Sequence, residues 1–519
     1  MREVVFLPHK RESVETSIAT VSRQFGGVAI ADTDENAVRA ASSAGIENVV
    51  VPMAAIRTAD LDGPRARVID TVKESGASLI ALDVEEGAPL PSTSEGAFYP
   101  VVYYEPAQIQ KHIIGRRTIP MSFGPSKSDY FILNIRYSND EAPVANSVVK
   151  MIIWPGTVSN ERISLSVVTN EDGQAIFPLR GNQFRNVHIS VEAGREGHWG
   201  GFVDVNETLS GDIFHVDRID LLQQLDCVRV MATGAMVNDG TGVRIAIIDS
   251  GVGPHPDLSH VIGDDDDTSS HGTHVAGVIG SRANGIYQGL APAAELRSYR
   301  VFDDQAIGQA SNFSVHKAIE QAVIDDCHLV NMSLKVTSIN SEPVVGAALA
   351  YAKSRGVLCF SAAGNDGGKL PVGFPARHPD CVAVAACGHL DGLPDRASDR
   401  WTITNLTPST PGSDQNVFFG KFSNRAKEGT SIDIIAPGCG VVSTLMDNGY
   451  GPMSGTSMAC PVAVGSFAQH LSSSPNILNM AAGAARYDHM IALMDSVTSS
   501  IGLAAKYEGQ GMIPYGHGI

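Results

Sequence analysis

The pattern of hydrophobic residues divides the chain into three stretches of different periodicity. In residues 1–87, short apolar runs alternate with segments in which apolar residues recur every three or four positions. The runs predict strands and the periodic segments predict helices. The expected strands cover residues 4–8, 27–31, 48–52 and 78–82, and the expected helices cover residues 13–25, 34–45 and 64–75. We therefore expect a small α/β domain, followed by an irregular linker at residues 88–127.

The second stretch, residues 128–210, has the period-two pattern of β-strands. Its apolar runs are separated by turn residues and lie at 130–138, 147–154, 163–169, 174–179 and 186–193. The sequence NEDGQ at Asn170–Gln174 predicts a hairpin turn. We expect a small immunoglobulin-like β-sandwich here, and its residues do not suggest catalysis.

In the third stretch, residues 211–519, strands and helices alternate again. Near-continuous apolar runs lie at 243–249, 296–302, 329–334, 357–364 and 381–387, and helical patterns begin near His271, Val315 and Val344. Strands that are apolar on both faces indicate a parallel sheet covered by helices. The expected fold class is α/β: a three-layer domain with a mostly parallel sheet, preceded by the small α/β domain and the β-sandwich.

Composition and charge narrow the class of protein. The 519 residues are 43% hydrophobic and 18% charged, which is typical of a globular protein. The formal net charge of −18 argues against nucleic acid or an anionic membrane as the main partner. No run approaches the roughly 18 apolar residues of a membrane helix, and no apolar signal segment follows the N-terminus, so we expect a cytoplasmic location. The seven cysteines, an odd number without tight spacing, predict reduced thiols.

Three separate motifs supply the groups needed for nucleophilic catalysis. Asp249 ends an apolar strand, at the sheet edge where α/β proteins bind ligands. His271 opens a helix in SHGTHVAGVIG, and Ser457 lies at the start of a helix in SGTSMACP. A serine hydroxyl needs a base to take its proton, and the base needs a third group to fix its tautomer. The hypothesis is that Asp249 orients His271, which activates Ser457.

Each of these residues also has a simpler interpretation. Asp249 could be a turn residue before Ser-Gly, and Ser457 could be a helix N-cap. His274 lies three residues after His271 and could replace it as the base. The two could also bind zinc, although HGTHV lacks the glutamate of the HExxH pattern. Cys460 is a weaker candidate nucleophile, because a cysteine inside a helix usually packs as a small apolar residue.

Taken together, the motifs resemble those of the subtilisin-like serine proteases, the subtilase family. The resemblance covers about residues 215–516 and rests on AIIDSGVGPHPDL, SHGTHVAGVIG, NMSL, SAAGNDG and SGTSMACP, and more weakly on KYEGQGMI. It implies a subtilisin-like catalytic domain and a serine endopeptidase that hydrolyses protein or peptide substrates through an acyl-enzyme. It also implies that Asn365 binds the oxyanion together with the backbone N–H of Ser457.

The same resemblance implies a substrate cleft. Extended peptide would lie between Ser333-Leu334 and Ala306-Ile307-Gly308 and add a strand there. The pocket for the residue before the cut would have the walls Ser333, Leu334 and Lys335 on one side and Ala362, Ala363, Gly364 and Asn365 on the other. Gly373 would form its floor and leave room for a large side chain. The family usually has glycine where this chain has Lys335, so that wall is expected to be narrower or basic.

Regulation and cofactors are implied only by the resemblance. The chemistry requires no cofactor. Asp257 and the loop at 281–289 correspond roughly to a calcium site of the family, so structural calcium is an expectation. The acidic run Asp264–Asp267 is expected to be a solvated loop. The N-terminal α/β unit resembles family propeptides, so residues 1–210 are expected to regulate or position the catalytic domain.

The sequence is also compatible with two other functions. The chain could be an inactive peptide-binding protein that uses the cleft and the β-sandwich. It could also be a peptide ligase or cyclase, since that chemistry uses the same acyl-enzyme. The natural substrate and the oligomeric state do not follow from the residues.

Overall fold

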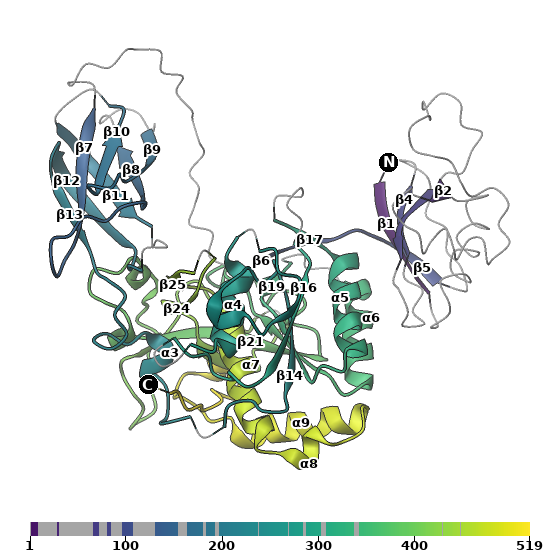
Figure 1. The fold of residues 1–519 in the computed structure, drawn as a ribbon. Helices are drawn as coiled ribbons and strands as arrows, with labels where there is room; N and C mark the ends of the chain where they lie inside the picture. Colours follow the sequence, from purple (N-terminus) through teal and green to yellow (C-terminus); the bar gives the residue numbers. More distant parts are fainter. Residues whose placement is uncertain are drawn as a thin grey trace, which may run out of the picture.

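The computed structural model has three parts, an N-terminal sheet, a β-sandwich and a larger α/β part below them (Figure 1). It describes residues 2–8, 29–30, 66–71, 80–84, 96–106, 130–153, 163–179, 183–192, 197–236, 238–267, 269–283, 287–302, 308–336, 342–427, 429–446 and 448–518. Across these segments, every helix is too short or too polar to cross a membrane.

The N-terminal part is a sheet of five strands in the order β2-β3-β4-β1-β5. The strands are β1 (Arg2–Pro8), β2 (Ala29–Ile30), β3 (Ala66–Thr71), β4 (Ile80–Val84) and β5 (Gly96–Pro100). Strands β1, β2 and β4 confirm the strands expected near residues 4–8, 27–31 and 78–82. The expected strand at 48–52 and the expected helices at 13–25 and 34–45 lie outside the described residues.

The helix expected at residues 64–75 is wrong, because residues 66–71 form strand β3. This segment contains the β-branched residues Val68, Ile69 and Thr71, which favour strands. It pairs antiparallel with β4, and Val68 lies opposite Leu82. Pairing with a neighbouring strand thus outweighs a helical spacing of apolar residues. Strand β5 lies in the stretch that was expected to be an irregular linker.

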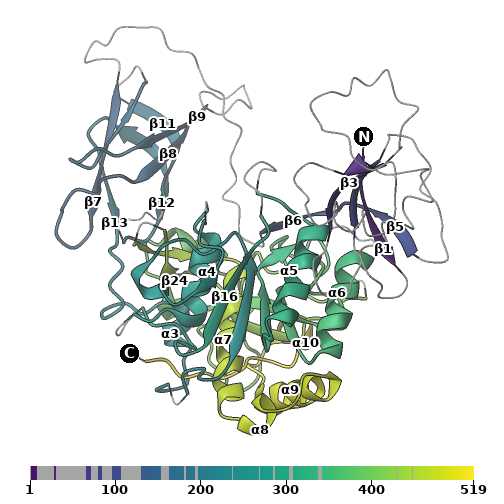
Figure 2. The ribbon, with the colours of Figure 1, turned by 45° about the vertical axis from the view of Figure 1, so that its right-hand side comes forward.

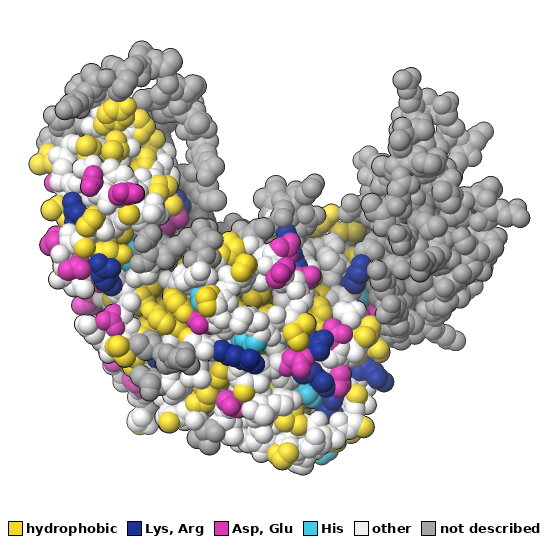
Figure 3. Space-filling view, in the orientation of Figure 1, with side chains coloured by type: hydrophobic (Ala, Val, Ile, Leu, Met, Phe, Trp, Pro, Cys, Tyr) yellow, Lys and Arg dark blue, Asp and Glu magenta, His cyan; other side chains and the backbone are white. Residues whose placement is uncertain are grey.

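The second part is a β-sandwich of two sheets, β10-β7-β13 and β12-β11-β8-β9. The strands are β7 (Phe131–Tyr137), β8 (Val148–Ile153), β9 (Ile163–Val168), β10 (Gln174–Phe177), β11 (Gln183–Val191), β12 (Gly201–Leu209) and β13 (Ile213–Val216). Alternate residues of β7 are buried, as the period-two pattern predicts. Some hydrophobic side chains of this part are exposed, and Figure 3 shows hydrophobic atoms on its surface. The exposed ones include Val168, Ile176, Phe202, Leu209 and Ile213.

The turn expected at Asn170–Gln174 forms, but it does not make a hairpin. Gly173 has a φ of +72°, and its N–H donates to the carbonyl of Asn170. The two strands that it joins pair with different neighbours, β9 with β8 and β10 with β7. The turn therefore carries the chain from one sheet of the sandwich to the other.

The third part is built on an eight-stranded sheet in the order β15-β16-β14-β18-β20-β21-β22, with β23 also paired to β21. Its strands are β14 (Arg244–Asp249), β15 (Ile262–Gly263), β16 (Glu295–Arg300), β18 (Leu329–Met332), β20 (Leu358–Ala362), β21 (Cys381–His389), β22 (Val417–Phe419) and β23 (Ile434–Pro437). Every pairing in it is parallel except that of β22 with β21. The expected mostly parallel sheet is confirmed.

Helices cover both faces of this sheet (Figure 2). One core contains Ile245 and Ile247 of β14 and residues of α4 (His271–Gly280) and α7 (Thr456–Ser472). The other contains Ala246 and Ile248 and residues of α5 (Asn312–Ile324) and α6 (Pro343–Ser354). Alternate residues of one strand thus enter two different cores, which explains its unbroken apolar sequence. Smaller elements complete this part: α3 (Cys227–Val230), β24 (Val441–Thr444), β25 (Tyr450–Met453), α8 (Pro475–Leu478), α9 (Ala484–Val497) and α10 (Ala505–Glu508).

A short three-stranded sheet joins the N-terminal part to the α/β part. Its central strand, β6 (Tyr103–Pro106), follows β5 almost directly in the chain. It lies between β17 (Ala310–Ser311) and β19 (Leu334–Lys335), and it is antiparallel to both. A segment from the N-terminal end of the chain therefore completes a sheet at the edge of the α/β part.

Candidate active site

Asp249 and His271 are joined by a buried hydrogen bond at the carboxyl edge of the large sheet. Asp249 is the last residue of β14, and His271 is the first residue of α4. The distance from His271 Nδ1 to Asp249 Oδ1 is 2.7 Å, and the two side chains are 0% and 1% exposed. Because Nδ1–H donates to the carboxylate, Nε2 is the acceptor of the ring. This is the tautomer that a general base requires.

A second buried carboxylate, Asp267, supports the start of α4. It accepts hydrogen bonds from Thr273 N at 2.9 Å, from Thr273 Oγ1 at 2.6 Å and from Ser250 Oγ at 3.0 Å. The acidic run Asp264–Asp267 was expected to be a solvated loop. Its first three residues are exposed, as expected, but Asp267 is buried. Nothing in a run of four aspartates distinguishes the one whose side chain turns inward.

Opposing effects set the protonation of His271. Burial lowers its pKa, but the charge of Asp249, the hydrogen bond with it and the charge of Asp267 raise it, and the net pKa lies above the ordinary 6.5 of histidine. His274 behaves differently, since burial and the nearby His271 lower its pKa to about 3. Its Nε2–H donates to the carbonyls of Val441 and Gly451, at 2.9 and 3.1 Å. This geometry favours His271 as the base and makes His274 a neutral structural residue.

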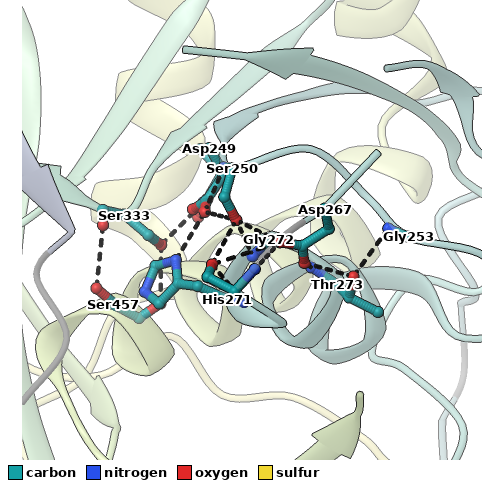
Figure 4. Close-up of polar contacts among 11 residues, drawn as sticks. Asp249, Ser250, Gly253, Asp267, His271, Gly272, Thr273, Ser333 and Ser457 are labelled. Atoms are coloured by element: carbon teal, nitrogen blue, oxygen red, sulfur yellow. Dashed lines mark hydrogen bonds and ion pairs between the residues drawn. The ribbon is translucent and has the colours of Figure 1, made fainter. Parts of the chain in front are cut away.

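Ser457 lies in the first turn of α7, where the helix N-terminus favours negative charge. Its Oγ donates to the carbonyl of Ser333 at 3.0 Å, and Ser333 Oγ donates to the Ser457 carbonyl at 2.8 Å. Figure 4 shows the imidazole of His271 between Asp249 and Ser457. Among the described residues, the buried Nε2 of His271 has no hydrogen-bond partner. The Ser457 hydroxyl is therefore hydrogen-bonded to the Ser333 carbonyl, and Nε2 of His271 is the proton acceptor beside it.

Thr456 fixes the orientation of Asn365. The side-chain oxygen of Asn365 accepts from Thr456 N at 2.9 Å and from Thr456 Oγ1 at 2.8 Å. Thr456 Oγ1 also accepts from the backbone N–H of Gly364 at 3.1 Å. Because Thr456 binds the side-chain oxygen of Asn365, the NH₂ group of Asn365 is on the side of the amide away from these two hydrogen bonds. The residue before Ser457 thus links the nucleophile to the candidate oxyanion donor.

The structure describes the two walls and the floor that were expected for the pocket. Ser333 contacts Ser457, and Leu334 and Lys335 form β19. On the other wall, the carbonyl of Ala363 accepts from Gly373 N at 2.9 Å, so the expected floor lies directly against that wall. Ala362 ends β20, and Gly364 follows Ala363 with a φ of +107°.

The opposite side of the cleft is described only in part. Gly308 is described and has a φ of +69°, but Ala306 and Ile307 lie outside the described residues. Among the described residues, Ala310 and Ser311 form the strand that pairs across the cleft, two and three residues after Gly308. The sequence did not reveal this pairing, because the partner strand β6 was itself not expected.

Strand β6 lies in the cleft between these two segments. The carbonyl of Val102 accepts from Asn312 N at 2.7 Å, and Tyr104 is paired with Ala310. The Tyr104 side chain is fully buried, and its hydroxyl donates to Glu342 at 3.2 Å. Glu342 also accepts from Asn312 Nδ2 at 3.0 Å. The chain thus fills, with its own residues, the position where an extended peptide was expected.

The described surroundings of Asp257 do not supply a set of hard oxygen ligands for calcium. Its carboxylate accepts a hydrogen bond from the hydroxyl of Tyr450, and Nδ1 of the His255 imidazole lies 3.8 Å from it. Within the described segments, no three His, Cys, Asp or Glu side chains are grouped to hold a metal ion. Residues 284–286 of the adjacent loop lie outside them, so structural calcium stays a prediction from the sequence.

Comparison with known proteins gives the family of the chain. The model of the subtilase family matches residues 240–498. Subtilisin Savinase of Lederbergia lenta is 34% identical over 250 residues, which are 46% of this chain and 80% of that protein. The thermostable alkaline protease of Halalkalibacterium halodurans is 35% identical over 249 residues, 46% of this chain and 60% of that protein. The solved structure of the prenylagaramide maturation protease PagA aligns with 54% of this chain and 92% of that chain, at 23% identity and a TM-score of 0.41.

This chain belongs to the subtilase family of serine proteases. It spans 60% of the alkaline protease, so it shares only part of that relative's length. The family match begins at residue 240, so the N-terminal sheet and the β-sandwich lie outside it. The comparisons do not support the intracellular location expected from the sequence.

Proposed function

We propose that this chain is a serine endopeptidase that acts through an acyl-enzyme on Ser457. The observation that carries the proposal is the buried hydrogen bond of His271 with Asp249, beside Ser457 (Figure 4). For attack, the Ser457 hydroxyl turns from the Ser333 carbonyl toward His271 Nε2, by rotation about its own side-chain bond. His271 takes the proton while Ser457 Oγ bonds to the scissile carbonyl carbon.

The charges that develop in this reaction have partners at the site. The new imidazolium is stabilised by the carboxylate of Asp249. The oxyanion meets the side-chain NH₂ of Asn365 and the backbone N–H of Ser457. His271 then protonates the leaving amine as the carbon–nitrogen bond breaks. Water, deprotonated by the same ring, releases the acyl group from Ser457.

Hydrolysis of an unfolded protein substrate tests this proposal. Ser457→Ala removes the nucleophile and is expected to abolish cleavage. Ser466→Ala is the matched control, because Ser466 lies in the same helix and its Oγ donates to the Val462 carbonyl of that helix. Equal cleavage by wild type and Ser457→Ala would contradict the proposal.

The second part of the proposal is that the N-terminal segment regulates the enzyme by occupying its cleft. Its support is strand β6, which pairs with β17 on one side and β19 on the other. The buried Tyr104 and its hydrogen bond to Glu342 hold this strand in place. A substrate would need the same two edges, so it has to displace β6.

The register of β6 suggests where the chain would cut itself. Lys335 pairs with Glu105, and Leu334 pairs with Pro106. Ser333, the residue before Leu334, is hydrogen-bonded to Ser457, and we propose that the residue after Pro106 binds beside it. That residue is Ala107, which lies outside the described residues. We expect self-cleavage of the bond between Ala107 and Gln108.

Incubation of the purified chain, followed by N-terminal sequencing, tests the regulatory part. Wild type is expected to yield a new N-terminus at Gln108, and Ser457→Ala is expected to stay intact. If both proteins keep their full length while wild type hydrolyses other substrates, self-processing is wrong and the peptidase assignment stands.

A further inference from the structure

Lys335 occupies the pocket expected for the side chain before the cut. A methyl group placed on Gly373, the expected floor, would lie 3.3 Å from Lys335 Cβ. A methyl group placed on Gly364, in the opposite wall, would lie 3.1 Å from Lys335 Cδ. The aliphatic stem of the lysine therefore runs between the two glycines, and its side chain is 7% exposed. The room that a glycine floor would leave for a large side chain is taken by this stem.

The ammonium group of Lys335 is anchored at the rim of the pocket. Its Nζ lies 3.0 and 3.1 Å from the two carboxylate oxygens of Asp366. Asn424 holds that carboxylate with a hydrogen bond of 2.9 Å, and its oxygen accepts from the Asp366 N–H. Because Asn424 holds Asp366, the ammonium group has an anchor that does not belong to the occupant of the cleft.

The same ammonium group also contacts the strand in the cleft. Lys335 Nζ lies 3.1 Å from a carboxylate oxygen of Glu105, whose side chain is 42% exposed. The two residues are also opposite one another in the β6–β19 pairing. The proposed cut follows Ala107, and Glu105 lies two positions before Ala107. The lysine therefore contacts the third residue of the peptide, counted backwards from the cut. The lysine thus has a fixed partner in Asp366 and an exchangeable partner in the peptide.

We infer that Lys335 determines the substrate class: extended peptides with a small residue directly before the cut and an acidic residue two positions further N-terminal. The stem excludes large side chains from the pocket by occupying it, and the ammonium group selects a carboxylate. The chain's own sequence has this form, with Glu105, Pro106 and Ala107. This inference rests on the proposed peptidase function.

Two variants separate the two roles of the lysine. Lys335→Gly removes both the stem and the charge. Lys335→Met keeps a stem of similar volume and removes only the charge. Lys353→Ala is the control, because Lys353 also pairs with an aspartate, Asp380, but lies in α6. Peptides containing Tyr-Glu-Pro-X-Gln are the substrates, with X as Gly, Ala, Leu or Phe, and with Gln in place of Glu in a second set.

The inference predicts how kcat/KM ratios change among proteins that are purified as the full chain and incubated for the same time to allow self-cleavage. Wild type and Lys353→Ala should prefer Ala over Phe at X by about tenfold or more. They should prefer Glu over Gln by up to about fivefold, the range of a partly exposed ion pair. Lys335→Met should keep the preference for Ala over Phe and lose the preference for Glu over Gln. Lys335→Gly should lose both preferences.

The outcomes distinguish this inference from the function on which it rests. Wild type that cleaves equally well after Phe and Ala, or Lys335→Gly with unchanged ratios, would overturn the inference alone. Labelling of Ser457 by a fluorophosphonate is measured on each protein in parallel and reports both folding and nucleophile. Wild type with neither labelling nor cleavage would overturn the proposed function, and the inference with it.

Discussion

At the scale of single residues, two carboxylates determine the protonation of His271. Asp249 bonds directly to the ring, whereas Asp267 acts through its charge from the other side of the α4 N-terminus. Burial alone would lower the pKa of His271; the charge of Asp249, the hydrogen bond with it and, as the smallest contribution, the charge of Asp267 raise it. Asp267 is a positioning residue, since it holds Thr273 and Ser250 and does not touch the reacting groups.

Asp267→Asn is expected to shift the pH dependence of kcat/KM. The base works only when His271 is neutral, so activity rises as the pH passes the raised pKa of His271. Removing the charge of Asp267 lowers that pKa, and the acidic limb should move to lower pH. The limb is measured with a fluorogenic peptide, and Asp265→Asn, at an exposed position of the same run, is the control. A limb that stays in place in Asp267→Asn would show that Asp267 does not act on the base.

At the scale of elements, β6 depends on the burial of one aromatic side chain. Tyr104→Ala removes a fully buried ring and its hydrogen bond to Glu342. The loss of such a ring costs about 3 kcal/mol, which corresponds to roughly 100-fold more frequent opening of the strand. Amide exchange of Asn312, whose N–H donates to Val102, should accelerate accordingly in a Ser457→Ala background.

The control for this experiment is Tyr103→Ala in the same background. Tyr103 lies in the same strand, but its side chain is 42% exposed. Its removal should change the exchange of Asn312 much less. Equal exchange rates in the Tyr103 and Tyr104 variants would contradict the role given to Tyr104.

Elements with strong periodicity were predictable, and elements that depend on distant partners were not. The apolar runs at 243–249 and 329–334 are strands because both of their faces meet helices, which the sequence itself reveals. Strand β6 has no such pattern, since it exists through pairing with β17 and β19, more than 200 residues away. The motifs identified Asp249 and His271, but the inward turn of Asp267 depends on contacts that spacing does not encode.

At the scale of the whole molecule, the β-sandwich is joined to the α/β part through a shared core. Trp199, Ile219 and Leu221 belong to the hydrophobic core that also contains α4 and α7. A backbone hydrogen bond of 2.6 Å from Ser398 N to the Gly200 carbonyl lies at the same junction. Self-cleavage after Ala107 would release the N-terminal sheet and leave the sandwich attached to the catalytic part.

The cysteines provide a prediction for the folded molecule as a whole. All seven are free and buried, in agreement with the reduced thiols expected from the sequence. Burial raises the pKa of the Cys359 thiol to about 12, and the same effect raises that of Cys460. A reductant should leave the unfolding temperature unchanged. A thiol reagent should react slowly with the native protein and with all seven thiols after denaturation, and rapid native reaction would contradict this burial.

The central claim is that Ser457 is a nucleophile activated by His271. Mass spectrometry of the chain after treatment with a fluorophosphonate probe tests it most directly. The account predicts one adduct on Ser457, its absence in Ser457→Ala, and labelling slowed by about 10³-fold or more in His271→Ala. No adduct on Ser457, or an adduct that forms equally fast without His271, would contradict the account.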